Sequence, residues 1–104
     1  MTAMAVGQMK VHPGKDREYV ALMQEWKSLA AKHGLNPRLL VSVFAGPDVG
    51  VYTGVYEAAD LVTLITGFQA LSADPAFQSL RQRLYGPDGV CTLLSFSQAT
   101  EISL

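Results

Sequence analysis

Two tyrosines flank a glycine on one face of a short apolar segment. Tyr52, Gly54 and Tyr56 fall two residues apart, and strand side chains alternate between faces, so all three share one face. Two aromatic walls beside a bare position can receive a flat ligand, which the phenol groups can orient. On this hypothesis Tyr52 and Tyr56 are catalytic candidates and Gly54 binds the ligand. The alternative is ordinary aromatic packing, with Gly54 marking a close approach of a neighbouring element.

A tryptophan and a histidine share one face of a predicted helix over 15–33. Trp26 and His33 are seven residues apart, which is about two helical turns. His33 can act as a general base near neutral pH or ligate haem iron, and Trp26 can stack on an aromatic ring. We include Tyr19, from the same apolar stripe, among the candidate ligand-binding residues. The alternative is that His33 caps the helix end beside Gly34 while Trp26 fills the core.

An arginine near the end of a later helix is the candidate anion site. Arg81 lies four residues after Phe77, beside the apolar stripe, where a guanidinium can clamp an anionic substrate. The alternative is that Arg81 and Arg83 both face water and offset the helix dipole. His12, which precedes Pro13-Gly14 in a predicted turn, is assigned a surface role.

Several classes of chemistry lack their usual signatures. The sequence contains no dinucleotide-binding glycine fingerprint, phosphate-binding loop, His-Glu-x-x-His pair, Cys-x-x-Cys pair or serine nucleophile elbow. One cysteine and two histidines do not suggest a protein-built metal site, so we predict no metal. We also predict no cofactor, with haem bound through His33 kept as an alternative. Any chemistry then depends mainly on the reactivity of the substrate.

Charge and hydropathy narrow the partners and the compartment. A net charge of −1 and a pI near 6.0 give no basic field for nucleic acid. No run of about 18 apolar residues occurs, and residues 1–11 do not resemble a signal peptide, so we expect no membrane partner. The lone Cys91 in an apolar run suits a reducing compartment. We therefore expect a soluble, cytoplasmic protein with one domain over 1–104.

The hydrophobic periodicity predicts four strands and three helical segments. Strands are expected at 3–11, 38–45, 51–57 and 90–96, with the tail after 96 able to extend the last one. The second helical segment, capped by Asp60, is weakened at Gly67 and can be interrupted there. Asp74-Pro75 then starts the last helix. A turn at 46–50 should join the middle strands as an antiparallel hairpin.

This order predicts an α+β, ferredoxin-like β-α-β-β-α-β fold with a four-stranded antiparallel sheet. Right-handed crossovers place all helices on one sheet face. The strands at 3–11, 39–45 and 90–96 carry apolar residues on both faces, so the second face should be bare and apolar. Gln8 and Ser42 interrupt it and should pair in the interior or across an interface. Packing of two identical chains through this face would cover it, and we predict a homodimer.

Short motifs at the element boundaries resemble the dimeric α/β-barrel superfamily, especially its NIPSNAP-like and antibiotic-biosynthesis-monooxygenase-like small proteins. They are Val11-His12-Pro13-Gly14-Lys15, Lys32-His33-Gly34, Phe44-Ala45-Gly46-Pro47, and Leu71 with Asp74-Pro75-Ala76-Phe77-Gln78. The resemblance spans nearly the whole chain. It implies a homodimer closing an α/β barrel, with a small-molecule cavity between each sheet and its helices. Relatives include cofactor-free oxygenases, haem-degrading oxygenases, cyclases, isomerases and proteins without assigned roles.

Three hypotheses follow for the function. The first is a small-molecule-binding homodimer that acts as a cofactor-independent oxygenase or cyclase on a phenolic or aromatic metabolite, with His33 or a pocket tyrosine handling the proton. The second is a non-enzymatic ligand-binding or assembly protein with a small or filled cavity. The third is a haem-binding protein. An open apolar cavity lined by Trp26, Tyr52 and Tyr56 would favour binding or catalysis.

Overall fold

The computed structural model describes residues 2–43 and 50–102. The elements follow the predicted order: β1 (Ala3–Val11), α1 (Asp16–Lys32), β2 (Asn36–Val41), β3 (Val51–Ala58), α2 (Leu61–Ala73), α3 (Pro75–Tyr85) and β4 (Cys91–Thr100). The motif at 44–47 and all but the last residue of the expected turn at 46–50 lie outside the described residues. The last strand extends to Thr100, which confirms that the tail can continue it.

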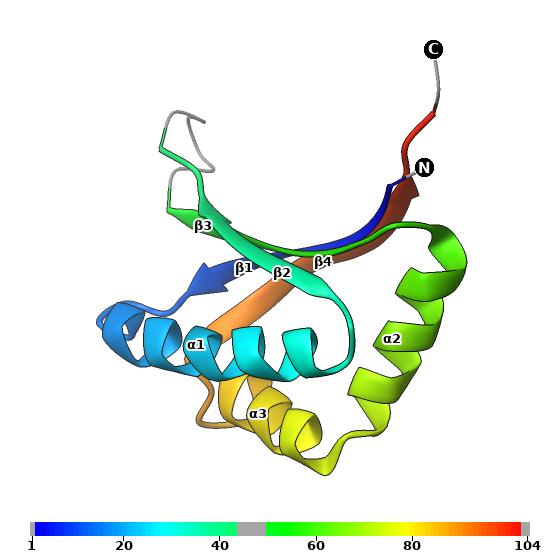
Figure 1. The fold of residues 1–104 in the computed structure, drawn as a ribbon. Helices are drawn as coiled ribbons and strands as arrows, with labels where there is room; N and C mark the ends of the chain where they lie inside the picture. The colour runs from blue at the N-terminus through cyan, green and yellow to red at the C-terminus, as the bar shows by residue number, and fades with distance from the viewer. Residues whose placement is uncertain (1, 44–49, 103–104) are drawn as a thin grey trace.

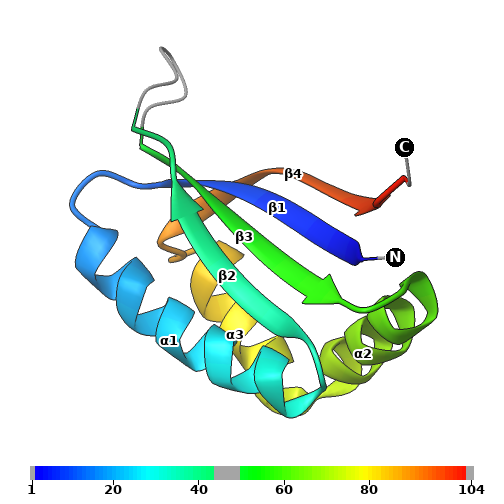
Figure 2. The ribbon, with the colours of Figure 1, turned by 45° about the horizontal axis from the view of Figure 1, so that its top comes forward.

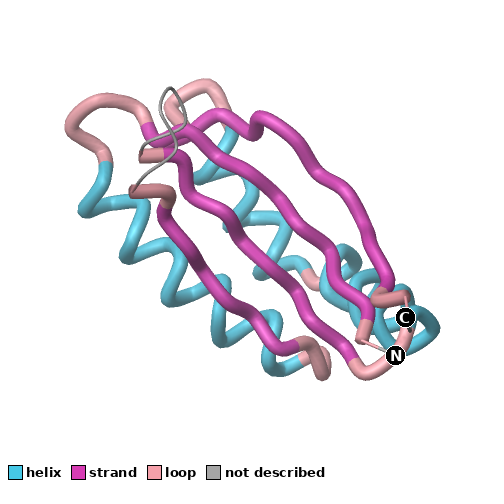
Figure 3. The backbone as a smooth tube through the Cα atoms, turned by 90° about the horizontal axis from the view of Figure 1, so that it is seen from above, coloured by secondary structure: helices cyan, strands magenta, loops and turns pink. Residues whose placement is uncertain are grey.

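The four strands form one antiparallel sheet in the order β2-β3-β1-β4 (Figure 2). All three helices lie beneath the same face of this curved sheet (Figure 1). The view from above shows the strands in front of the helices, with nothing from the described chain over the second face (Figure 3). The ferredoxin-like α+β fold is therefore confirmed.

Two aspartates begin the last two helices as predicted. Asp60 Oδ1 accepts a hydrogen bond from the Thr63 backbone N–H at 2.7 Å, and Asp74 Oδ1 accepts one from the Ala76 N–H at 2.9 Å. Each bond satisfies a donor that the helix itself leaves free. The two caps fix where α2 and α3 start.

The expected interruption of α2 at Gly67 is wrong, because the helix runs unbroken from Leu61 to Ala73. A Cβ on Gly67 would lie 2.8 Å from Leu35 Cδ2 and 2.9 Å from the His33 carbonyl oxygen. The glycine thus permits a close contact between α2 and the chain that leaves α1. Packing outweighs the weak helix propensity of glycine at this position.

The core lies between the sheet and the helices. Tyr19, Leu64, Leu71 and Leu80 are the largest fully buried side chains, and together they join α1, α2 and α3. Burying each such side chain stabilises the fold by about 1.5–3 kcal/mol. Among the described residues, no helix combines the length and the apolar character needed to cross a bilayer.

A register shift changes the predicted pattern of apolar residues on the last strand, although Leu94, the extra residue at the shift, is still 51% exposed. The register against β1 shifts between Gln8 and Met9, so that Leu93 lies opposite Met9 while Phe96 lies opposite Gly7. Because directly opposed residues share a face, Leu93 and Phe96 both point toward the helices although they are three residues apart. The second face of β4 carries instead Thr92, Ser95, Ser97 and Ala99.

The second sheet face is therefore mixed. Met4 and Val6 on β1, Val55 on β3 and Leu40 on β2 form an apolar centre. Polar pairs accompany it: Arg38 contacts Glu57 at 2.5 Å, and Ser95 Oγ donates to Gln8 Oε1 at 3.2 Å. The expected pairing of Gln8 thus occurs within one chain, at an exposed position. The wholly apolar face expected from the sequence is reduced to this central strip.

Candidate functional site

A cavity of about 350 Å³ lies between the sheet and the helices. Its lining is mostly hydrophobic and aromatic, as is usual for small-molecule sites. The lining residues are Gly7, Met9, Met23, Trp26, Gly54, Tyr56, Phe68, Phe77, Arg81, Leu84, Tyr85, Leu93 and Phe96. Tyr85, Leu93 and Phe96 are each more than a third exposed, so the cavity opens to solvent near β4 and the end of α3.

Trp26 and Tyr56 form the polar centre of this apolar cavity. Trp26 Nε1 donates to Tyr56 Oη at 2.7 Å, and the two rings meet nearly edge to face with centroids 5.3 Å apart. Both side chains are buried, with 5% and 7% of their surface exposed. Within residues 2–43 and 50–102 no protein group accepts the Tyr56 hydroxyl proton. This hydroxyl is thus held by one hydrogen bond and keeps a proton to donate to a ligand.

Burial controls the protonation of Tyr56. Desolvation raises the pKa of Tyr56, and the Trp26 hydrogen bond and the charge of Arg81 only partly oppose this rise. The phenol therefore stays protonated at neutral pH. It can donate a hydrogen bond to a ligand oxygen, but it is not a base.

Arg81 and Tyr85 form the cavity wall on α3. They are four residues apart and so lie on the same face of the helix. The Arg81 guanidinium carbon is 5.8 Å from the centre of the Phe77 ring, and no carboxylate of the described chain forms an ion pair with it. A second, more polar hollow adjoins the cavity through Arg81 and Tyr85, and includes Gln78, Gln82 and Gly86. This wall combines an uncompensated positive charge with an apolar interior.

Gly54 fits both sequence hypotheses at once. It lines the cavity, and a Cβ at this position would lie 3.4 Å from Met9 Cε and 3.7 Å from Trp26 Cζ2. The close approach of Trp26 and the open cavity therefore meet at the same residue. Its partner across β1 and β3 is Gly7, which also lines the cavity.

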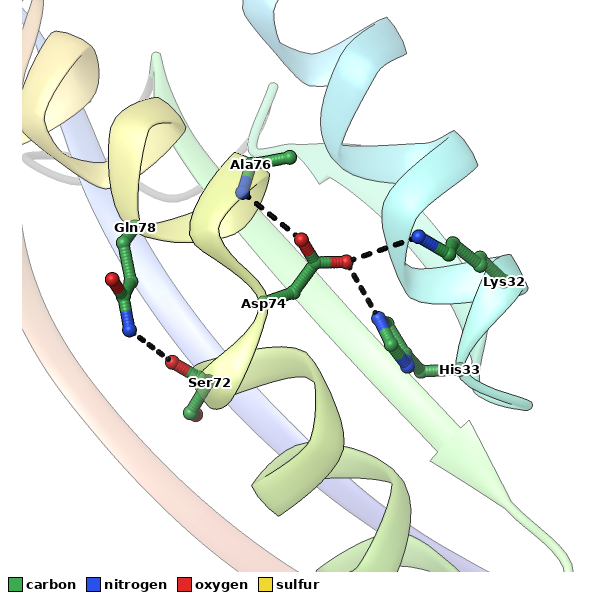
Figure 4. Close-up of polar contacts among 6 residues, drawn as sticks. All are labelled: Lys32, His33, Ser72, Asp74, Ala76 and Gln78. Atoms are coloured by element: carbon green, nitrogen blue, oxygen red, sulfur yellow. Dashed lines mark hydrogen bonds and ion pairs between the residues drawn. The ribbon is translucent and has the colours of Figure 1, made fainter.

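His33 lies apart from the cavity lining. Its Nε2 is 2.8 Å from Asp74 Oδ2, and because an ionised carboxylate only accepts, this nitrogen donates (Figure 4). Lys32 Nζ donates to the same oxygen at 3.4 Å. The His33 hydrogen bond is the main reason why the pKa of Asp74 falls to about 2. The contact joins the end of α1 to the junction of α2 and α3, close to the capping alternative considered for His33.

Tyr19 and Tyr52 also lie outside the lining. The Tyr19 hydroxyl donates to Met9 Sδ at 3.4 Å, and the Tyr52 hydroxyl donates to Asp16 Oδ2 at 3.3 Å. The two rings pack with centroids 4.7 Å apart. Tyr52 shares a strand face with Tyr56, but four residues of extended chain separate them by roughly 13 Å. The shared face therefore does not bring both hydroxyls to one site.

Comparison with known proteins identifies the fold. No protein-family model matches the sequence, and no curated protein matches it. Among similar solved structures is SnoaB, a cofactor-independent oxygenase from Streptomyces nogalater, with a TM-score of 0.73 at 16% identity over 99% of this chain and 95% of that one. A NIPSNAP family protein from Agrobacterium tumefaciens gives 0.70 at 16% identity, over 95% and 90% of the two chains. The chain shares its ferredoxin-like α+β fold with these structures.

A third structure with the same fold extends the similarity. A putative antibiotic biosynthesis monooxygenase from Chloroflexus aurantiacus gives a TM-score of 0.67 at 13% identity, covering 99% of this chain and 95% of that one. All three alignments include the sheet and the helices that enclose the cavity. At these identities the similarity establishes the fold.

Several residues that line the cavity were not among the candidates from the sequence. Tyr85 could have been predicted from the sequence, because it lies four residues after Arg81 and eight after Phe77 on the same helix face. Phe96 could not have been predicted from the sequence, because the direction of its side chain depends on the register shift in β4. Gly7 becomes informative only when β1 is paired with β3.

Proposed function

We propose that this protein is a homodimer that binds a small, partly aromatic molecule between its sheet and its helices and acts on it as a cofactor-independent oxygenase. The observation that carries the proposal is an apolar cavity in which the proton of one buried phenol, Tyr56, is free for a ligand beside the charge of Arg81. SnoaB, which is similar in fold, is a cofactor-independent oxygenase.

The lining favours an aromatic ligand. Trp26, Tyr56, Phe68 and Phe96 form a connected series of rings, with neighbouring centroids 5.3 to 5.5 Å apart. Ring faces and edges of this kind contact an aromatic molecule through offset or edge-to-face packing. Arg81 is near enough for its charge to act on the Tyr56 phenol, so a ligand carbonyl or phenol would point toward these two residues.

The proposed reaction uses a substrate that itself reduces oxygen. A CH₂ group next to an aromatic carbonyl loses a proton to water, and the resulting carbanion adds O₂ to give a hydroperoxide after protonation. Loss of water then leaves a carbonyl, so that CH₂ and O₂ become C=O and H₂O. The Tyr56 hydroxyl would donate a hydrogen bond to the enolate oxygen, and Arg81 would stabilise its negative charge. Burial keeps the phenol protonated and therefore able to donate throughout.

The candidate residues from the sequence have different roles in the proposed reaction. Tyr56 takes the catalytic role, and Trp26, Gly54 and Arg81 bind or position the substrate. His33, Tyr52 and Tyr19 have structural contacts instead, with Asp74, Asp16 and Met9. The buried thiol of Cys91, whose pKa desolvation raises to about 11, fits a reducing cytosol and takes no part.

The homodimer is supported by the second sheet face. No element of the described chain lies over its apolar strip of Met4, Val6, Leu40 and Val55, and although neighbouring side chains already bury Val55, Leu40 is 55% exposed. Packing two such sheets face to face would bury the strip, while polar pairs at its edge fix the orientation. Size-exclusion chromatography with light scattering at micromolar concentration tests this, and a stable monomer would contradict it.

Oxygen uptake tests the reaction. The purified protein is mixed with anthrone, and oxygen consumption and product carbonyl are measured together. We expect uptake that falls by about 10- to 1000-fold in Tyr56→Phe, because one donor to the oxyanion is lost, while Tyr52→Phe stays near wild type. Unchanged turnover in Tyr56→Phe would remove its catalytic role. Binding of anthrone without oxygen uptake would leave a ligand-binding protein instead of an oxygenase.

A further inference from the structure

A line of side chains leads from the cavity to the protein surface. Met9 lines the cavity, and its Sδ accepts a hydrogen bond from the Tyr19 hydroxyl at 3.4 Å. The Tyr19 ring packs against the Tyr52 ring with centroids 4.7 Å apart. The Tyr52 hydroxyl donates to Asp16 Oδ2 at 3.3 Å, and Asp16 is exposed to solvent. Four side chains from β1, α1 and β3 thus form one continuous series of contacts.

Trp26 borders the cavity end of this line. Met9 Cε and Trp26 Cζ2 both lie within 4 Å of the position that a Cβ on Gly54 would take, so the two side chains share one small space. The polarizable sulfur of methionine packs favourably beside aromatic rings. Tryptophan, tyrosine and methionine are also the side chains that lose a single electron most readily. Electron transfer between side chains slows steeply with distance, and every step along this line is short.

The hydroxyl of Tyr19 is not explained by packing alone. The side chain is fully buried, and within the described residues its hydroxyl has a thioether sulfur as its partner, which is a weak acceptor. A phenylalanine would fill the same space without the cost of burying a weakly paired hydroxyl. A buried polar group of this kind calls for a reason, and redox chemistry is one. One-electron oxidation is far easier for a phenol than for a phenylalanine ring.

Tyr52 differs from the buried tyrosines in where its proton can go. A tyrosine that loses an electron also loses its phenol proton, because the radical cation is a very strong acid. The Tyr52 hydroxyl points at the Asp16 carboxylate, which can take that proton. Within the described chain, the hydroxyls of Tyr19 and Tyr56 donate to no oxygen or nitrogen. An oxidising equivalent that enters the line should therefore come to rest on Tyr52.

We propose that Met9, Tyr19 and Tyr52 form an electron-transfer path by which an oxidising equivalent leaves the cavity and reaches the protein surface. A peroxyl radical in the cavity takes one electron from Trp26 and becomes a peroxide anion, which is protonated by water. One electron passes from Tyr52 through the path to Trp26, while the Tyr52 proton moves to Asp16 Oδ2. The products are intact Trp26, a neutral Tyr52 radical and protonated Asp16. Ascorbate then returns an electron to Tyr52, and Asp16 returns the proton.

The use of this path rests on the proposed function, whereas the path itself does not. A carbanion that reacts with O₂ by single-electron steps releases radical intermediates into the cavity. The path would protect Trp26, which holds the Tyr56 hydroxyl, from lasting oxidation. None of the three path residues donates to the substrate in the proposed reaction, so the initial rate of oxygen uptake should not depend on Tyr52.

Pulse radiolysis tests the path without any substrate. Azide radicals oxidise tryptophan by one electron, and Trp26 is the single tryptophan of the chain. The decay of the tryptophan radical and the growth of a tyrosyl radical are followed by their optical absorption in the full-length protein. The variants are Tyr52→Phe, Tyr19→Phe and Asp16→Asn. Tyr85→Phe is the matched control, because Tyr85 also lines the cavity and is 37% exposed.

In the wild-type protein the tyrosyl radical should grow as the Trp26 radical decays, at a rate independent of protein concentration. Tyr52→Phe and Tyr19→Phe should each remove most of this growth. Asp16→Asn keeps a hydrogen-bond acceptor but removes the base, and should slow the growth by at least about tenfold. Heavy water should slow it in the wild-type protein, because a proton moves in the same step. Tyr85→Phe should change nothing.

Full tyrosyl growth in folded Tyr52→Phe, or its loss in Tyr85→Phe, would overturn the path. So would a Trp26 radical that decays without any tyrosyl signal, and Tyr19 would then be an ordinary core residue. An unchanged rate in Asp16→Asn, which alters only an exposed side chain, would do the same if the tyrosine variants fold poorly. Absence of oxygen uptake with anthrone would refute the proposed function and leave the electron path standing.

Discussion

The hydrogen bond between Trp26 and Tyr56 gives the sharpest prediction for stability. Tyr56→Phe removes the only acceptor that the described structure provides for Trp26 Nε1, a donor in a side chain with 5% of its surface exposed. Leaving a buried donor unsatisfied costs about 1–3 kcal/mol, which for a domain of this size lowers the melting temperature by at least about 4 °C. Tyr52→Phe also deletes a tyrosine hydroxyl, but one that forms a solvent-exposed hydrogen bond to Asp16. It should change the free energy of unfolding by less than about 0.5 kcal/mol.

Urea unfolding followed by circular dichroism measures this difference without relying on Trp26 fluorescence. Trp26→Phe, alone and combined with Tyr56→Phe, completes a double-mutant cycle. The coupling free energy between the two sites should be about 1 kcal/mol. The slope of the unfolding free energy against urea concentration should stay unchanged in all variants. A loss below about 0.5 kcal/mol in Tyr56→Phe, together with a coupling near zero, would refute the reasoning. The Tyr56 hydroxyl would then not be held by Trp26, and its proposed role as an oriented donor would lose its basis.

The remaining predictions concern pH and assembly. The pKa of Asp74 is about 2 in the folded protein, against an ordinary 3.8, so this carboxylate stabilises the fold above pH 4. The contribution is lost as the pH falls from about 4 to 2. Urea titrations should show that loss of stability, and Asp74→Asn should show a smaller loss. Burial raises the pKa values of Tyr19, Tyr56, Tyr85 and Cys91 above their unfolded values, so stability should fall as pH rises above about 9, and a flat profile up to pH 11 would contradict this. Leu40→Glu, on the exposed strip of the second sheet face, should give a folded monomer in light scattering, whereas Val62→Glu on the outside of α2 should leave the dimer intact.

The arrangement of the elements follows from the sequence because local signals agree with one another. Asp60 and Asp74-Pro75 begin their helices, and Gly34, with a φ of 79°, ends the first one. Periodicity then sets the strand and helix order, and handedness rules place the helices on one face. Where the predicted elements differ from the structure, the cause is their tertiary environment. Gly67 lies at a helix contact and does not break α2, and β2 starts at Asn36 because Pro37 is tolerated on an edge strand.

The site could be predicted only in part, because its residues come from six elements. Trp26, Gly54, Tyr56 and Arg81 were accessible from helical stripes and strand alternation, and all four line the cavity. His33 and Tyr52 share those patterns but lie too far along their elements to reach it. Gly7 and Phe96 depend on how β1 pairs with β3 and β4, and a shift of one residue in β4 changes which side chains face the helices. Periodicity cannot supply that register.

A crystal structure of the protein grown with 2-naphthoate tests the central claim most directly. The account predicts electron density for the ring system within the cavity, in contact with Trp26 and Phe96, with the carboxylate toward Arg81 or Tyr56. A cavity filled by its own side chains, or a ligand bound only elsewhere, would contradict the account.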